Sequence, residues 1–219
     1  MGIIFIFIIA LALIFNGKIA TFLIENQAKV SISADEINKN KKKRPEINRD
    51  NIDTLTPADV IKCRLSDNKA LYIGYLAVPS IGLKLPIINE LSNYSISIGA
   101  AVYYDNMKMG KGNYVLASHF WYDSETALFS PLYYHVGQGA QKQKMYITDL
   151  ENLYTYEVST YKVVNTSETS YIQQNNSKNL LTLFTCNYTA DAGRIVMQGE
   201  LVNTQPLNEI DEATLNEIK

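Results

Sequence analysis

The chain of 219 residues contains few of the residues on which several protein classes depend. It has two cysteines, two histidines and one tryptophan. Two cysteines allow one disulfide at most, which excludes a small fold held together by a disulfide framework. The net charge is −2, so the chain has no basic excess with which to bind a nucleic-acid backbone. We therefore expect no nucleic-acid partner.

What the chain does contain suits a packed, strand-rich domain. Hydrophobic residues make up 47% of the sequence, a fraction that argues against a disordered chain. There are 15 tyrosines, and Thr, Val and Ile are also plentiful, which favours strands over helices. The length is enough for one ordinary domain and an appendage.

The two cysteines occupy different kinds of segment. Cys63 lies in a polar, helix-like stretch, whereas Cys186 ends a strongly apolar one. A single bridge between a flanking segment and a core strand would be a poor framework. We expect both thiols to be free, with one disulfide as the alternative.

The N-terminus predicts a membrane anchor over residues 1–24. An uncharged apolar run ends at Phe15, Asn16 to Lys18 interrupt it, and Ile19 to Ile24 resume the apolar pattern. Counted through Ile24 the segment has membrane-spanning length. No clear small-residue cleavage site follows, so we expect an uncleaved anchor, with a cleaved signal peptide as the alternative. The basic run at 39–44 favours a cytoplasmic C-terminus by the positive-inside rule, unless Met1 is an internal start that omits a basic head.

The rest of the chain divides into three parts. Residues 25–70 are interpreted as a polar stalk with a short helix at about 57–67, which begins at a Thr56 cap with Pro57 in the first turn. Residues 71–205 alternate strand and turn signals, as in a barrel or sandwich, and residues 206–219 form a tail. The expected strands are Tyr72–Val78, Leu83–Ile88, Ile98–Val102, Asn113–Ser118, Lys144–Thr148, Leu153–Val164, Leu180–Thr185 and Arg194–Val202, with one helical stretch at Ala127–His135.

Three residues at strand ends could form a reactive site. His119 and Cys186 each end a strand, and Arg194 begins one. If these ends meet at one rim, nearby positive charge would favour the Cys186 thiolate, His119 could protonate a leaving amine, and Arg194 could stabilise an oxyanion. Alternation along the strands would place Ala117 and Phe184 on the approach to this rim.

Purely structural, non-catalytic roles would also explain these three residues. A cysteine that closes an apolar strand is often an inert core residue. His119 could be a hydrogen-bonded rim histidine, and Arg194 could mark the solvent-facing start of a strand. Spacing alone leaves both explanations open.

Longer motifs around these residues resemble the sortases, in particular class A. The segment Thr182-Leu-Phe-Thr-Cys186 resembles the family's cysteine signature. Its arginine strand resembles Arg194-Ile-Val-Met-Gln-Gly-Glu-Leu, and its histidine strand resembles Gly112-Asn-Tyr-Val-Leu-Ala-Ser-His119. Leu128-Phe-Ser-Pro-Leu132 and Ile73-Gly-Tyr-Leu-Ala-Val-Pro-Ser-Ile-Gly82 are similar to further family segments. The resemblance covers roughly residues 72 to 203 in the family's order.

The resemblance implies an all-β fold, an eight-stranded sortase-type barrel with short helices, preceded by an N-terminal membrane helix. It implies a single-pass membrane protein with an extracellular catalytic domain. Its partners would be surface proteins with a C-terminal Leu-Pro-x-Thr-Gly-like signal, cleaved between Thr and Gly and joined to a peptidoglycan-precursor amine through a thioester. Cys186 would be the nucleophile, His119 the acid and base, and Arg194 the oxyanion or positioning group. The substrate groove would contain Thr185, Ala117, Phe184 and Val196.

Some features depart from the family pattern or narrow it. The stretch 165–179, where the family closes over its substrate, is polar and lacks the common proline. Asp105 and Glu168 are too sparse for the calcium site of some members, so we predict no metal and no cofactor. The chain has no second apolar span at its C-terminus and no aromatic lid motif before the barrel. Both features disfavour the pilus-building class of sortases. The alternatives are a dedicated or mainly hydrolytic sortase-like peptidase, or a catalytically silent barrel that binds peptides or cell wall.

Overall fold

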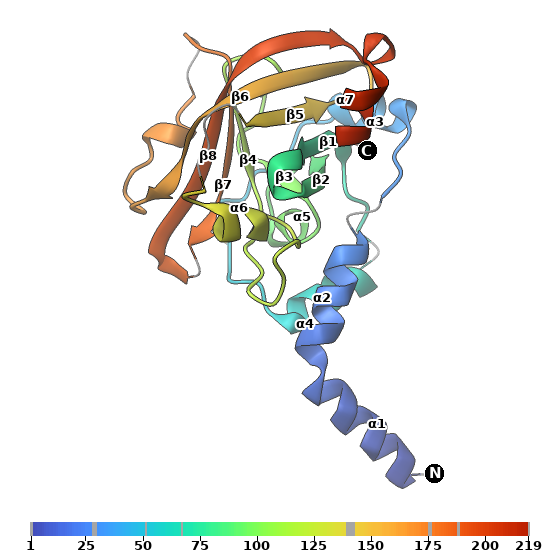
Figure 1. Ribbon diagram of the computed structural model, residues 1–219. Coiled ribbons are helices and arrows are strands. Elements are labelled where there is room, and N and C mark those ends of the chain that lie inside the picture. The colour runs from blue at the N-terminus through green and yellow to red at the C-terminus, as the bar shows by residue number, and fades with distance from the viewer. Residues whose placement is uncertain are drawn as a thin grey trace.

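A closed β-barrel forms the body of the protein (Figure 1). The computed structural model describes residues 2–27, 30–50, 52–66, 68–138, 143–174, 177–187 and 189–218. Within them, eight strands are hydrogen-bonded in the order β1-β2-β3-β4-β7-β8-β6-β5, and β5 pairs with β1 to close the barrel. The strands are β1 (Tyr72–Val78), β2 (Leu83–Ile88), β3 (Ala100–Val102), β4 (Asn113–Ala117), β5 (Lys144–Thr148), β6 (Asn152–Val164), β7 (Leu180–Asn187) and β8 (Thr189–Pro206).

The predicted strands are confirmed, and the barrel replaces the sandwich alternative. The bounds of β1, β2 and β5 agree with the sequence pattern. β8 is longer than predicted, because it pairs with the long strand β6 from Asn152↔Pro206 to Val164↔Arg194. A continuous partner satisfies backbone hydrogen bonds over the whole length of a strand, even where the side chains are polar.

Side chains on the two faces of β4 serve two apolar clusters. All five residues of this strand are buried. Tyr114 and Leu116 point into the main core inside the barrel, with Trp121 and Phe129. Ala117 belongs to a smaller cluster, outside the main core, that includes Phe184. The alternation of side chains along a strand therefore makes β4 both a core strand and a wall of the site.

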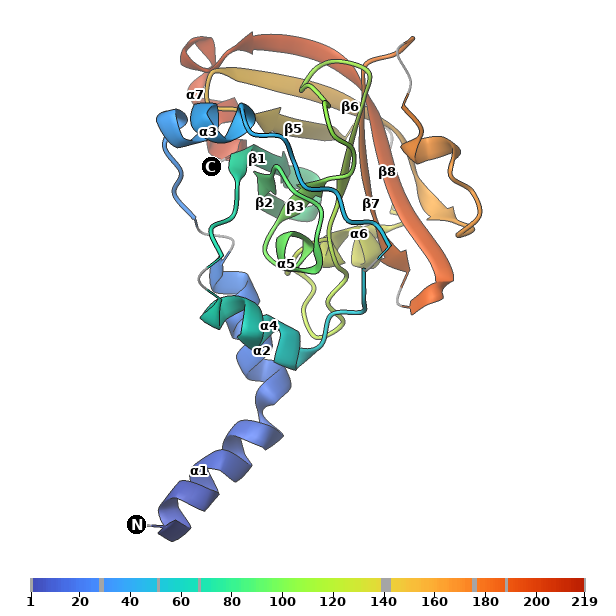
Figure 2. The same ribbon diagram turned by 180° about the vertical axis from the view of Figure 1, so that it is seen from behind.

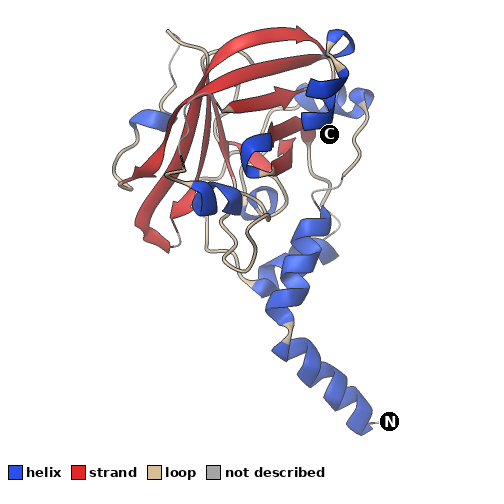
Figure 3. Cartoon of the chain, in the orientation of Figure 1, coloured by secondary structure: helices blue, strands red, loops and turns tan. Residues whose placement is uncertain are grey.

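The helices lie outside the barrel (Figure 3). The sequence predicted one membrane helix over residues 1–24, but this region forms two helices, α1 (Gly2–Ile14) and α2 (Asn16–Gln27). Among the described residues, no helix combines the length and the apolar character needed to cross a bilayer. The interruption at Phe15 directly precedes Asn16 and Gly17, residues of low helix propensity that begin α2.

Helix α2 packs against the domain that contains the barrel. Ala20 and Ile24 are buried in the main core cluster. The indole Nε1 of Trp121 donates to Thr21 Oγ1 at 2.7 Å, and Ser124 Oγ donates to Glu25 Oε1 at 2.7 Å. Polar and apolar contacts together hold the second half of the N-terminal apolar region against the domain.

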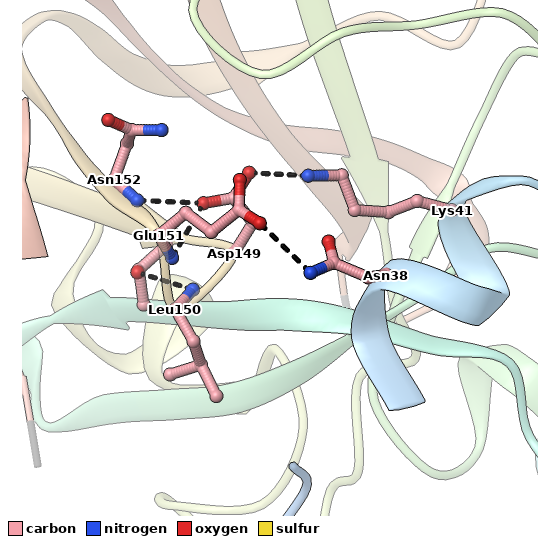
Figure 4. Close-up of polar contacts among 7 residues, drawn as sticks. Asn38, Lys41, Asp149, Leu150, Glu151 and Asn152 are labelled. Atoms are coloured by element: carbon pink, nitrogen blue, oxygen red, sulfur yellow. Dashed lines mark hydrogen bonds and ion pairs between the residues drawn. The ribbon is translucent and has the colours of Figure 1, made fainter. Parts of the chain in front are cut away.

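Helix α3 (Ala34–Lys41) is held to the turn between β5 and β6 (Figure 4). Lys41 Nζ forms an ion pair of 2.6 Å with Asp149, and Asn38 Nδ2 donates to Glu151 at 2.9 Å. Burial alone would raise the pKa of Asp149, but the Lys41 ammonium and the backbone N–H of Asn152 outweigh burial and lower it. A charge-assisted contact to a nearly buried carboxylate thus fixes this part of the polar segment.

The predicted short helix is confirmed as α4 (Pro57–Leu65). Thr56 Oγ1 accepts from the N–H of Asp59 at 3.3 Å, and Asp59 Oδ2 accepts from the N–H of Thr56 at 3.0 Å. This reciprocal capping box satisfies two backbone donors at the helix start. Figures 1 and 2 show α4 beside α2, below the barrel.

The remaining helical segments are short. The helix predicted around residue 130 is α6 (Ser130–His135), which ends at His135 as expected. The others are α5 (Asn93–Ile96), α7 (Glu212–Ile218) and three 3₁₀ turns at Pro79–Ile81, Ser170–Ile172 and Leu207–Glu209. Between α3 and α4 the chain crosses the outside of the barrel (Figure 2), where Ile47 forms a bridge with Leu91.

Candidate active site

The parallel pairing of β4 with β7 brings His119 and Cys186 to the same end of the barrel. The register runs from Asn113↔Leu180 to Ala117↔Phe184. His119 follows Ala117 by two residues, and Cys186 follows Phe184 by two. Because neighbouring strands lie about 4.8 Å apart, residues at equal distances beyond a parallel pair end at the same rim. Both residues line one cavity of about 260 Å³, here named the Cys186 cavity.

Arg194 reaches the same cavity from β8. It is the cross-strand partner of Cys186 in the antiparallel β7–β8 pair, and the register shifts immediately after Cys186. The preceding Gly193 has φ of 105°, and an added Cβ would lie 2.5 Å from the carbonyl oxygen of Val164. Glycine is therefore required at this position of β8, directly before Arg194. The guanidinium Nη1 donates to Gly193 O at 3.1 Å.

His119 is almost completely enclosed. Its side chain is 8% exposed, its N–H donates to Ile96 O at 3.2 Å, and its carbonyl accepts from Phe129 N at 3.0 Å. Burial lowers the pKa of His119 from 6.5 to about 4, while the negative charge of Asp59 partly opposes the shift. The imidazole is therefore uncharged at neutral pH, and its free nitrogen can accept a proton.

All seven residues expected from the sequence line the Cys186 cavity. Ala117, Phe184 and Val196 give it an apolar floor, and Phe184 packs edge-on against Tyr103 at 5.0 Å between ring centroids. Thr185 is buried, and its hydroxyl donates to Ser118 O at 2.9 Å. Thr185 thus ties β7 to the histidine strand as well as lining the cavity.

Part of the cavity wall comes from residues that the sequence did not single out. Arg49 and Ile52 lie in the segment expected to be a stalk, and both line the cavity. The Arg49 guanidinium lies over the rings of Tyr103 and Tyr104, at 5.1 and 4.7 Å from their centroids, and donates to Tyr103 O. No local motif marks these residues, because their position depends on where the crossing segment docks.

A buried polar network holds the opposite wall. Thr182 Oγ1 donates to Asn113 Oδ1 at 2.7 Å and accepts from Gln198 Nε2 at 2.8 Å. Gln198 and Asn113 both donate to Tyr171 O, at 3.1 and 2.8 Å. Three strands therefore fix the 3₁₀ turn that carries Tyr171 and Ile172 into the cavity. The signal for this network is one polar residue on each of the three strands, on the face that points away from the barrel core.

Neither cysteine is in a disulfide; Cys63 and Cys186 are both free and half-buried, as expected. Within the described ranges, no grouping of His, Cys, Asp and Glu side chains suits a metal ion. Cys186, His119 and Arg194 present a thiol, a neutral imidazole and a guanidinium to the Cys186 cavity.

Comparisons with known proteins agree with this geometry. A family profile described as a sortase domain matches residues 76–202. Sortase A of Streptococcus agalactiae is 31% identical, over 97% of this chain and 88% of that protein. Sortase A of Listeria monocytogenes is 34% identical, over 94% of this chain and 92% of that protein. The solved structure of Listeria monocytogenes sortase A has a TM-score of 0.58 and 33% identity, and covers 67% of this chain and 96% of its own.

The matched region spans the strands that carry all three candidate site residues. The two sortase A relatives match over 94% of this chain or more. The chain thus belongs to the sortase family of cysteine transpeptidases, with class A sortases as its relatives.

Proposed function

We propose that this sortase cleaves a Leu-Pro-x-Thr-Gly-like signal between Thr and Gly and transfers the Thr carbonyl to a cell-wall precursor amine. The observation that carries the proposal is the convergence of Cys186, His119 and Arg194 on one half-apolar cavity. The apolar floor suits the Leu-Pro part of such a signal, and the thiol lies where the scissile bond would follow. Thr185, Ala117, Phe184 and Val196 are the proposed groove residues.

The first half of the reaction uses the neutral imidazole. His119 removes the proton of Cys186, and the thiolate attacks the Thr carbonyl carbon. Arg194 stabilises the negative charge that develops on the carbonyl oxygen. The C–N bond then breaks, His119 returns its proton to the leaving glycine amine, and a thioester remains on Cys186. An amine resolves the thioester in the second half.

The proposal also covers the domain organisation of the protein and its location in the cell. Residues 71–205 form the catalytic barrel, 25–70 connect it to an N-terminal anchor at 1–24, and 206–219 form a C-terminal tail. The apolar character of residues 2–15 supports attachment to a membrane, with the barrel on the extracellular side, as in membrane-anchored family members.

The test is the intact mass of the protein from Asn16 onward, which keeps α2, after mixing with a Leu-Pro-x-Thr-Gly peptide. We expect a peptide adduct on the wild type and on Cys63→Ala, and none on Cys186→Ala. An added oligoglycine amine should release the adduct as a ligated product. If water alone releases it, the chain is a hydrolytic peptidase. If no adduct or cleavage occurs across a panel of signals, the barrel is a binder.

A further inference from the structure

A second cavity lies on the other side of His119, between α4 and α5. It has a volume of about 350 Å³ and is here named the α4 cavity. Asp53, Asp59, Cys63 and Ser97 are among its lining residues, and His119 closes one end. His119 is the residue that lines both this cavity and the Cys186 cavity. The imidazole therefore separates two spaces of different chemical character.

The α4 cavity is built by one face of a helix. Asp59, Lys62, Cys63 and Ser66 are spaced by three or four residues along α4, so their side chains lie on the same side. Val60 points elsewhere and is buried in the main core cluster with Ala20 and Ile24 of α2. Helix α4 thus stands between α2 and the cavity, and the capping box at Thr56 fixes its start.

Among the described residues that line the α4 cavity, Asp53 and Asp59 are anions and Lys62 is the one cation, so this lining has a negative character. The hydrogen bond from the Thr56 side chain lowers the pKa of Asp59, so this carboxylate stays ionised. Asp53 is held at its loop position by Asn93, whose Oδ1 accepts from Asp53 N at 2.9 Å. Hydroxyl and amide groups around them can bind a peptide backbone.

The reaction requires a second approach to His119. While the thioester exists, the acyl part of the first substrate occupies the Cys186 cavity. An incoming amine must therefore reach the thioester from another side, and it must meet a base there. Cavities that share a single wall, with the base in that wall, satisfy both requirements.

We infer that the α4 cavity receives the acceptor substrate, a peptide with a terminal ammonium group, and that Asp53 and Asp59 attract that ammonium. This inference rests on the proposed transpeptidase function. The ammonium loses one proton to solvent and a second to His119 as its nitrogen bonds to the thioester carbon. The C–S bond breaks at the same carbon, which leaves Cys186 as a thiolate and His119 protonated, and the pair is ready for the next cycle.

The kinetic test uses triglycine as the acceptor. Asp53→Asn and Asp59→Asn should each raise the KM for triglycine about fivefold. In Asp53→Asn, whose charge does not act on His119, the rate of adduct formation with the signal peptide should stay within about twofold of the wild type. Asp105→Asn, an exposed carboxylate outside the cavity, is the matched control and should change neither value. An unchanged KM for triglycine in both cavity variants overturns the inference. Asp53 lies outside the α4 cap, so its variant remains informative if Asp59→Asn unfolds the helix.

A binding test does not depend on turnover. In the Cys186→Ala protein, Cys63 is the remaining thiol and lies in the α4 cavity, so its alkylation by a maleimide reports occupancy. Triglycine should slow this alkylation at least threefold, and N-acetyl-triglycine, which lacks the ammonium, should slow it much less. Equal alkylation rates with and without triglycine overturn the inference. If the wild type forms no peptide adduct but triglycine still protects Cys63, the proposed reaction fails while the amine site stands.

Discussion

Burial of His119 predicts a specific loss of stability in acid. In the unfolded chain this imidazole has its usual pKa of 6.5, whereas burial lowers the value to about 4 in the folded protein. The unfolded state therefore binds a proton more tightly than the folded state between these values. Stability is fully present above pH of about 6.5 and is lost as the pH falls towards about 4.

The size of the effect follows from the difference between the two pKa values. At 1.36 kcal/mol per pKa unit, a shift from 6.5 to about 4 corresponds to roughly 3 kcal/mol of unfolding free energy. Replacing His119 by Gln removes the titrating group. The free energy of unfolding in urea, measured near pH 7 and near pH 4, should thus fall by roughly 3 kcal/mol more in the wild type than in His119→Gln.

The comparison with a variant is necessary because other groups also titrate in this range, among them Asp59 and Asp149, whose pKa values are lowered. Asp149 contributes equally to both proteins, and the charge of His119 is only the last cause of the lowered pKa of Asp59. His135→Gln is the matched control, since this ring lies at the end of α6 and hydrogen-bonds Gln138 at the surface. Equal acid losses in the wild type and His119→Gln would refute the argument that the folded site holds an uncharged imidazole.

Two further substitutions test the supports of the site. Gly193→Ala forces a Cβ to within 2.5 Å of Val164 O at φ of 105°. It should lower the free energy of unfolding, measured by heat or urea, by roughly 2–3 kcal/mol and should also lower the acylation rate. Gly82→Ala, where nothing lies within 4 Å, should cost about 1 kcal/mol, and an equal effect at both positions would contradict the steric argument. Thr182→Val removes the hydroxyl that hydrogen-bonds Asn113 and Gln198. It should lower the free energy of unfolding by about 1–3 kcal/mol and raise the KM for the signal peptide. Exposed Thr204→Val is its control, and a KM unchanged by Thr182→Val would show that the network does not shape the groove.

The local pattern of the sequence determined the strands and the candidate residues. Alternating apolar side chains between turn signals gave the bounds of β1, β2 and β5, and the Thr56-Pro57 step gave the start of α4. These features depend on neighbours along the chain, which the sequence displays directly. The motifs that end at His119 and Cys186 marked the site for the same reason.

The tertiary structure decided everything that depends on contacts between distant segments. The parallel register of β4 with β7 brought His119 and Cys186 to the same end of the barrel, and enclosure of the imidazole lowered its pKa. The same holds for the docking of α2 and for the second cavity that α4 forms at His119. A helical face or a polar crossing segment looks the same in sequence whether it meets solvent or a barrel, because burial is set by the partner and not by the segment itself.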